Sequence, residues 1–255
     1  MRKIIILTIF SLLYLTACNN NSNTNQTNNS TCSNDTIRVG IYVYHYPFGY
    51  LSNDNIAGID YDLMNEISKI SGSNIKFTPM SFEELIPALE SKKIDTIIAG
   101  MTVTEERKKY MDFSDGYYNS MQALLVRADN ETIKSESDLT GKLIGVIANT
   151  ISDTMISENT NLTIERLGSS SALILALKVG TIDAAVSDRE TCNHFIKYDN
   201  TIKLVDTIKF PEEYYAVAFR KEENPFLPEV NKALSIIKTN GFYKQLLEKH
   251  LGTNQ

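Results

Sequence analysis

The chain has 255 residues, of which 42% are hydrophobic and 22% charged, with 12 Gly, 3 Cys and no Trp. These values suit a globular protein of two lobes of about 100 residues each, and they exclude collagen-like, disulfide-framework and wholly disordered chains. The formal net charge is −6, which disfavours a nucleic-acid binder. The three His and three Cys show no CxxC or HxxxH spacing, so we expect no metal site and no cofactor.

The first 17 residues are typical of a secretory signal peptide. Arg2 and Lys3 precede an apolar run from Ile4 to Leu15, which is too short to span a bilayer of about 30 Å. The segment Leu15–Cys18 (LTAC) resembles the bacterial lipoprotein box, in which the cysteine thiol takes a lipid such as palmitate. We therefore expect lipidation of Cys18 and anchoring to the cell membrane, facing the periplasm or the extracellular surface. An ordinary signal peptide with an incidental cysteine is the alternative.

Residues 18–34 consist almost entirely of Asn, Ser, Thr and Gln after the cysteine. Such a segment buries too little apolar surface to offset its ordering entropy, so it is predicted to be a disordered tether. Cys32 lies in this tether and Cys192 in the second half of the chain. Two unbridged thiols are favoured over a disulfide between them.

The first half of the folded part alternates strands and helices. Strands are predicted at 36–44, 75–79 and 94–99, because these stretches are apolar and rich in β-branched residues. A helix is expected after Gly58, with Asp60 as its N-cap, and another after the capping box of Ser81 and Glu84. The alternation predicts a parallel α/β sheet.

The same alternation restarts in the second half. Strands are predicted at 143–147, 163–167 and 182–187, helices from 152 and over 170–178, a return strand at 214–219, and two helices over 228–250 around Gly241. We expect lobe 1 to contain 35–120 and 217–252, and lobe 2 to contain 121–216. Two hinge crossings are expected near 117–125 and 211–217. Ligands of open α/β sheets bind at the carboxyl ends of strands, so the cleft between the lobes is the expected site.

Five segments carry a family resemblance by their order and spacing. They are Gly58–Leu63 (GIDYDL), Leu85–Leu89 (LIPAL), Lys93–Thr102 (KIDTIIAGMT), Thr104–Lys109 (TEERKK) and Asp112–Tyr118 (DFSDGYY). In these segments the chain is similar to the bacterial extracellular solute-binding proteins, family 3, which supply polar amino acids to ABC importers. The resemblance covers about 36–252. It implies a two-lobed periplasmic-binding-protein (Venus-flytrap) fold that closes over an amino acid and presents it to a permease.

The resemblance also implies which residues hold the amino acid backbone. Arg107 would grip the α-carboxylate, since a guanidinium offers two parallel donors. Gly100 and Thr102 would add a backbone carbonyl and a hydroxyl or amide, and Asp188 would accept from the α-ammonium. A solvated helix charge is the alternative for Arg107, and a turn-forming residue is the alternative for Asp188.

Four further positions follow from the same resemblance. The backbone amides of Thr150 and Ile151 would meet the carboxylate at a helix start, although Asn149 stands where the family usually has Gly. Phe82 and His45 would form walls against the ligand side chain. Phe82 could instead belong to the core, and His45 could be merely exposed.

The identity of the side chain is less constrained. Tyr42 stands where basic-residue and glutamine binders often carry Asp, and Ile147 stands where glutamine binders place Lys. We therefore expect a neutral amino acid, bound by a monomer that works with ABC permease subunits. Two rival functions are a ligand-sensing subunit of a membrane receptor and a cyclohexadienyl-dehydratase-like enzyme. The enzyme would need His45, Glu212 or Glu213 as acid or base, and no nucleophile–base pair is present in the sequence, so no catalysis is expected.

Overall fold

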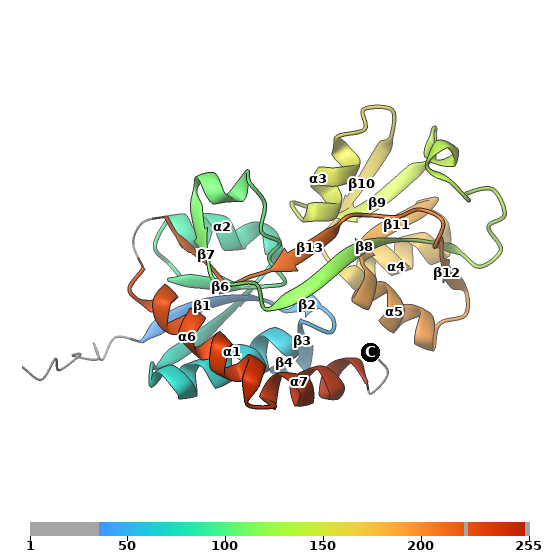
Figure 1. Ribbon diagram of the computed structural model, residues 1–255. Coiled ribbons are helices and arrows are strands. Elements are labelled where there is room, and N and C mark those ends of the chain that lie inside the picture. Colours follow the sequence, from blue (N-terminus) through green and yellow to red (C-terminus); the bar gives the residue numbers. More distant parts are fainter. Residues whose placement is uncertain (1–35, 222–223, 253–255) are drawn as a thin grey trace, which may run out of the picture. The chain divides into compact units, whose positions relative to one another are not determined.

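The computed structural model describes residues 36–221 and 224–252 (Figure 1). The predictions for the signal peptide, for Cys18, for the tether and for Cys32 fall outside these residues. Cys192 is a buried free cysteine.

The first sheet defines lobe 1 and draws strands from both ends of the chain. Its order is β5 (Ile75–Met80), β1 (Ile37–Tyr42), β6 (Thr96–Ile98), β14 (Ala218–Arg220) and β7 (Met111–Phe113). β1 runs parallel to β5 and β6, whereas β14 is antiparallel to both of its neighbours. The expectation of a parallel sheet for the first three predicted strands is therefore confirmed, and β14, which returns from the other lobe, joins this sheet in the antiparallel direction.

Helices and a small sheet complete lobe 1. They are α1 (Ile59–Ser71), α2 (Phe82–Glu90), α6 (Phe226–Thr239), α7 (Phe242–Leu251), the 3-10 turn η1 (Arg107–Lys109), and a sheet of β2 (Tyr44–His45), β3 (Gly49–Ser52) and β4 (Asn55–Ala57). Burial follows the predicted helical period in α1, where Ile59, Leu63, Met64 and Ile67 are fully buried.

The two helix starts differ from each other in how they are capped. The predicted capping box is confirmed in α2, because the backbone N–H of Ser81 donates to Glu84 Oε2 at 2.8 Å. The prediction that Asp60 caps α1 is wrong. Gly58 is the N-cap, at φ +124°, and a side chain there would collide with the carbonyl of Phe48. Asp60 lies in the first turn and is fully buried.

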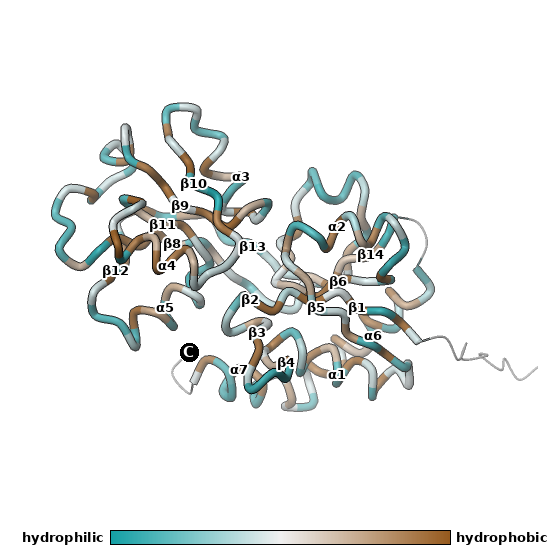
Figure 2. Tube along the Cα trace, turned by 180° about the vertical axis from the view of Figure 1, so that it is seen from behind, coloured by the Kyte–Doolittle hydropathy of each residue, from teal (hydrophilic) through white to brown (hydrophobic). Residues whose placement is uncertain are grey.

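The second sheet defines lobe 2. Its order is β10 (Thr163–Leu167), β9 (Leu143–Ile147), β11 (Ala184–Asp188), β8 (Tyr118–Arg127) and β12 (Ile202–Leu204), with β13 (Glu212–Tyr215) paired to β8. Its helices are α3 (Ile151–Ser157), α4 (Ser170–Val179), α5 (Arg189–Tyr198) and the 3-10 turn η2 (Glu136–Leu139). Hydrophobic residues concentrate in central strands such as β9, which is brown in Figure 2.

Two antiparallel strands, β8 and β13, run between the sheets (Figure 1). Their register places Tyr215 opposite Tyr118, and Tyr215 also forms a bridge with Thr102 of lobe 1. The predicted return strand at 214–219 is thus two strands, β13 and β14, one on each side of the crossing. These two paired strands bring the polar residues of the hinge next to the carboxyl ends of both sheets.

Within the described ranges, no helix has the length and apolar character needed to cross a membrane.

Candidate functional site

One small cavity gathers most of the predicted ligand residues. Seven of the eight predicted ligand residues line it, and Arg107 is the exception. The seven are His45, Phe82, Gly100, Thr102, Thr150, Ile151 and Asp188. Tyr42, Ala99 and Ile147 complete the lining. The cavity volume is about 20 Å³, which is enough for roughly one water molecule. Side chains must therefore move before an amino acid can enter.

Arg107 lies beside this cavity in the turn η1 and is 7% exposed. Its Nη1 donates to the carbonyl of Thr102 at 2.9 Å, and its Nη2 donates to the carbonyl of Asn149, in lobe 2, at 3.3 Å. Among the described residues it pairs with no carboxylate. Burial lowers the pKa of Arg107 from its ordinary value, yet a guanidinium stays protonated. A buried cation that has only carbonyl acceptors is suited to binding an anion.

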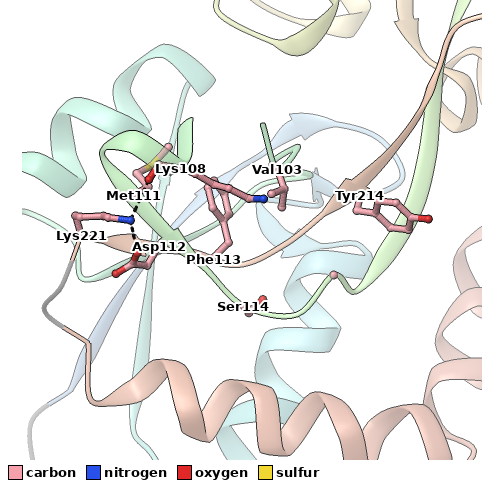
Figure 3. Close-up of a pocket in the computed structure, with 9 residues that line it drawn as sticks. Val103, Lys108, Met111, Asp112, Phe113, Ser114, Tyr214 and Lys221 are labelled. Atoms are coloured by element: carbon pink, nitrogen blue, oxygen red, sulfur yellow. Dashed lines mark hydrogen bonds and ion pairs between the residues drawn. The ribbon is translucent and has the colours of Figure 1, made fainter. Parts of the chain in front are cut away.

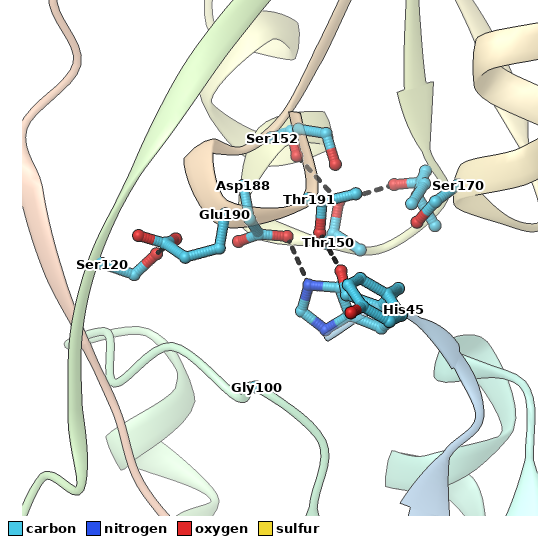
Figure 4. A network of polar contacts seen from close by, with 12 residues as sticks. His45, Gly100, Ser120, Thr150, Ser152, Ser170, Asp188, Glu190 and Thr191 are labelled. Carbon is cyan, nitrogen blue, oxygen red and sulfur yellow. Dashed lines mark hydrogen bonds and ion pairs between the residues drawn. The ribbon is translucent and has the colours of Figure 1, made fainter. Parts of the chain in front are cut away.

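Asp188 ends β11, and three side chains converge on its carboxylate; Figure 4 shows the contact with His45. Its Oδ1 accepts hydrogen bonds from Gln122 Nε2 at 2.9 Å and from the hydroxyl of Tyr215. Its Oδ2 lies 2.8 Å from Nε2 of His45. Burial alone would raise the pKa of Asp188, but His45, Tyr215 and Gln122 together bring it below its usual value. The carboxylate is therefore held ionised.

His45 is an ion-pair partner and not an exposed residue, because it is 5% exposed and its ring points at Asp188 (Figure 4). The ring packs on Phe48, with centroids 4.9 Å apart, and over Gly100. A Cβ on Gly100 would lie 2.7 Å from the imidazole, so the ring fits there because the residue is glycine. Burial works against the charged form, yet Asp188, with Asp60 and Glu190, outweighs it and raises the pKa of His45.

The remaining predicted residues are distributed around the two ion-binding groups. Phe82 is the first residue of α2, is 7% exposed and meets Tyr42 edge-on, so it belongs both to the core and to the cavity wall. Asn149 adopts φ +62°, a left-handed conformation that asparagine tolerates better than most side chains. Thr150 follows it as the N-cap of α3, with its hydroxyl turned back to the carbonyl of Ile147.

Sequence reasoning missed Gln122, Tyr215 and the role of Asp60, and it considered Glu213 only as a rival catalytic group. Asp60 accepts from the backbone N–H of Gly100 and from the hydroxyl of Tyr117, which fixes the strand end that carries Gly100. Burial raises the pKa of Asp60 to about 6. Asp60 could have been found from its spacing, since it lies three and four residues before the apolar Leu63 and Met64 and therefore shares their buried helix face.

Glu213 is also buried in the site. Its carboxylate accepts from the Thr102 hydroxyl at 2.7 Å and from Gln122 Nε2 at 2.6 Å. Burial and the nearby Asp188 raise its pKa to about 7. Its neighbour Glu212 is exposed and points to the other face of β13. Both oxygens of Glu213 are thus engaged by site residues, an arrangement suited to holding groups in place.

A larger surface cavity of about 740 Å³ lies on lobe 1 (Figure 3). Within it, Lys221 Nζ pairs with Asp112 Oδ1 at 2.9 Å and donates to the carbonyl of Lys108 at 3.0 Å. None of the predicted ligand residues lines it. Its charged side chains have partners at the surface, Lys221 with Asp112 and Lys108 with Glu105, in contrast to the converging groups around Asp188.

Two α/β sheets, joined by paired strands and meeting around a buried arginine and a buried carboxylate, define a two-lobed ligand-binding protein. The sequence profile of the bacterial extracellular solute-binding proteins, family 3, matches residues 37–253. The chain belongs to this family.

Individual relatives align over nearly the whole chain. The probable histidine-binding protein of Campylobacter jejuni is 32% identical over 245 residues, which cover 96% of each chain. The arginine-binding extracellular protein ArtP of Bacillus subtilis is 31% identical over 240 residues, or 92% of this chain and 91% of the relative. The structure of the arginine-, lysine-, histidine-binding protein ArtJ from Geobacillus stearothermophilus superposes with a TM-score of 0.82 at 28% identity, covering 87% of this chain and 97% of ArtJ.

Proposed function

We propose that the chain binds an L-amino acid in the cavity around Asp188 and delivers it to an ABC importer. One observation carries the proposal: a buried guanidinium that pairs with no carboxylate of the described residues lies beside the same cavity as an ionised carboxylate whose side chain is 15% exposed. These two groups match the carboxylate and the ammonium of a zwitterion. The names of the relatives, which include histidine- and arginine-binding proteins, agree with an amino acid as ligand.

The ligand's backbone would be held by residues of both lobes. Arg107 takes the α-carboxylate with two parallel N–H donors, next to the start of α3 at Thr150 and Ile151. Asp188 takes the α-ammonium, with the Thr102 hydroxyl and the Gly100 carbonyl as further acceptors. Because each of these two sets of groups contains residues of both lobes, the ligand links the lobes and favours the closed arrangement.

Binding requires His45 to withdraw. Its imidazole lies 2.8 Å from the carboxylate oxygen that the ammonium would use, and the cavity leaves room for about one water molecule. The ligand therefore exchanges one cation on Asp188 for another. This exchange keeps the carboxylate paired in both states, which avoids leaving a buried charge alone.

The side-chain part of the cavity favours a neutral amino acid. Tyr42, Phe82, Ala99, Ile147 and Ile151 form its walls, and none of them carries a charge at neutral pH. Among the described residues that line the cavity, Asp188 is the one carboxylate, and the α-ammonium takes it. An arginine or lysine side chain would lack a counter-charge there, which is costly in a buried site.

A thermal-shift screen of residues 34–255 against the twenty L-amino acids, cystine and ornithine tests the proposal. A ligand with a Kd of about 1 μM, present at 1 mM, stabilises the folded protein by about 4 kcal/mol. We expect strong shifts for one or a few neutral amino acids. Shifts confined to arginine, lysine or histidine would overturn the neutral class but keep amino acid binding. A flat profile for folded, ligand-free protein would overturn the function.

Phe82→Ala is expected to change the order of affinities among amino acids by about tenfold for the larger side chains, because it removes a wall and its buried contact area. Isothermal titration of the three strongest ligands measures this change. Leu175→Ala is the matched control, since Leu175 is 60% exposed on α4. An unchanged order would assign Phe82 to the core alone.

The family is extracellular, so the chain is an exported protein. We further propose that it is anchored by a lipid on Cys18 after removal of residues 1–17, and that it works as a monomer. Labelling of cells with an alkyne analogue of palmitate tests the anchor. Label should be incorporated into the wild-type protein and lost in Cys18→Ser; equal labelling of both would contradict lipidation at this residue.

A further inference from the structure

Glu213 connects the predicted binding groups of the two lobes. It lies in β13, one of the two strands that cross between the sheets, and is 9% exposed. One carboxylate oxygen accepts from the hydroxyl of Thr102 in lobe 1 at 2.7 Å. The other accepts from Nε2 of Gln122, in the second crossing strand, at 2.6 Å.

Gln122 links Glu213 to Asp188 by hydrogen bonds. Its Nε2 has two hydrogens, and they go to Glu213 and, at 2.9 Å, to Asp188 Oδ1. Its Oε1 accepts from the hydroxyl of Ser152 at 2.9 Å. The opposite amide orientation would place a carbonyl oxygen against two carboxylates, so the orientation is fixed by its partners. Gln122 is 1% exposed, and water does not compete for these bonds.

The direction of each hydrogen bond decides what the site offers. Because the Thr102 hydroxyl gives its hydrogen to Glu213, it has only lone pairs left for a ligand. Lone pairs suit an ammonium group and disfavour a second acceptor. Gln122 gives its amide hydrogens to Asp188 and Glu213, so the carboxylate of Asp188 is also held as an acceptor, and both Asp188 and Thr102 line the same cavity.

We propose that Glu213 is a positioning residue that makes the site specific for an ammonium group, acting through Thr102 and Gln122. This inference rests on the proposed amino acid binding. Glu213 lies behind the residues that touch the ligand and holds them in their acceptor orientation. This positioning role explains why Glu213 is a buried acid, whereas Glu212, the other acid of β13, is exposed.

The test is Glu213→Gln, which keeps the shape but turns one acceptor oxygen into a donor. The oxygen of the new amide can replace only one of the two carboxylate oxygens, so either Thr102 or Gln122 now faces an NH₂ group. That residue loses its acceptor or must turn its own oxygen toward the amide. We expect the affinity for the best amino acid of the wild-type protein, measured by isothermal titration, to fall about 10-fold or more. Glu212→Gln, which makes the same chemical change one residue away, should remain within about twofold of wild type.

A double-mutant cycle separates positioning from a general structural effect. Thr102→Val removes the hydroxyl that Glu213 orients, so Glu213→Gln should have a smaller effect on affinity in that background than in the wild type. Equal effects in both backgrounds, or affinity of Glu213→Gln within twofold of wild type, would overturn the proposal. If Glu213→Gln does not fold, Glu213→Asp replaces it, since the shorter acid cannot reach both donors and should show the same loss. A wild-type protein that binds no amino acid would instead overturn the proposed function.

Discussion

Arg107→Ala is expected to weaken the binding of every amino acid by about 10²–10³-fold, which corresponds to roughly 3–4 kcal/mol. The change removes the contact to the carboxylate, a group that all amino acids share, and leaves that carboxylate buried without its partner. All ligands should therefore lose affinity alike, whatever their side chains. Isothermal titration across the ligands that bind the wild-type protein measures the effect.

Lys108→Ala is the matched control for this experiment. Lys108 lies in the same 3-10 turn, carries the same charge, and pairs at the surface with Glu105 at 2.7 Å. Its replacement should leave affinity within about twofold of wild type, since exposed ion pairs contribute little. One amino acid bound by Arg107→Ala at wild-type affinity would contradict the assignment of Arg107.

His45→Phe is expected to tighten amino acid binding at about pH 6 by roughly tenfold. In this variant the ligand no longer has to displace the charge-assisted contact between His45 and Asp188, and a contact of this kind contributes about that factor. The sign follows from the raised pKa of His45. Below this pKa the imidazolium occupies Asp188 and competes with the ammonium. As pH rises through it, the imidazole becomes neutral and releases Asp188, so wild-type affinity should increase with pH.

The groups around His45 determine how much of this pH dependence the substitution removes. Asp188 of β11, Asp60 of α1 and Glu190 of α5 all favour the imidazolium. Glu213, with a pKa of about 7, gains its negative charge over the same interval and also favours the ammonium as pH rises. His45→Phe should therefore reduce the pH dependence between about pH 6 and pH 8.5 while a smaller part remains.

Titrations of both proteins at the two pH values test this prediction. His194→Phe is the control, because His194 stacks on Tyr46 with centroids 3.6 Å apart and does not line the cavity. That variant should keep the wild-type pH dependence. Weaker binding by His45→Phe at pH 6 would contradict competition at Asp188 and would assign His45 a purely supporting role as a wall.

Local sequence signals predicted most of the elements. The β-branched runs at β9 and β10 and the capping box of Ser81 and Glu84 specify their structures within a few residues, so these predictions are confirmed. α5 was missed because it starts directly after a strand and its sequence is polar on average, although Cys192, Phe195 and Ile196 pack against the core of lobe 2. The strands β2, β3 and β4 are too short to show an alternating pattern.

Motif resemblance placed Arg107 and Asp188 near one cavity, but it could not predict their partners. Gln122 and Glu213 are 91 residues apart, and their hydrogen bond depends on the antiparallel register of β8 and β13. His45 was expected as a wall. Its pairing with Asp188 depends on how closely the two lobes approach each other, and no local pattern encodes that distance.

The position of β14 has a consequence for the order in which the chain folds. This strand lies between β6 and β7 in the first sheet, although more than 100 residues separate it from both along the chain. The sheet of lobe 1 stays incomplete until residues 218–220 have been synthesised, whereas every strand of the lobe 2 sheet is available earlier. Lobe 2 can therefore fold first, and contacts this distant in sequence form slowly. A nascent chain whose N-terminal lobe cannot close early keeps that lobe unfolded for longer.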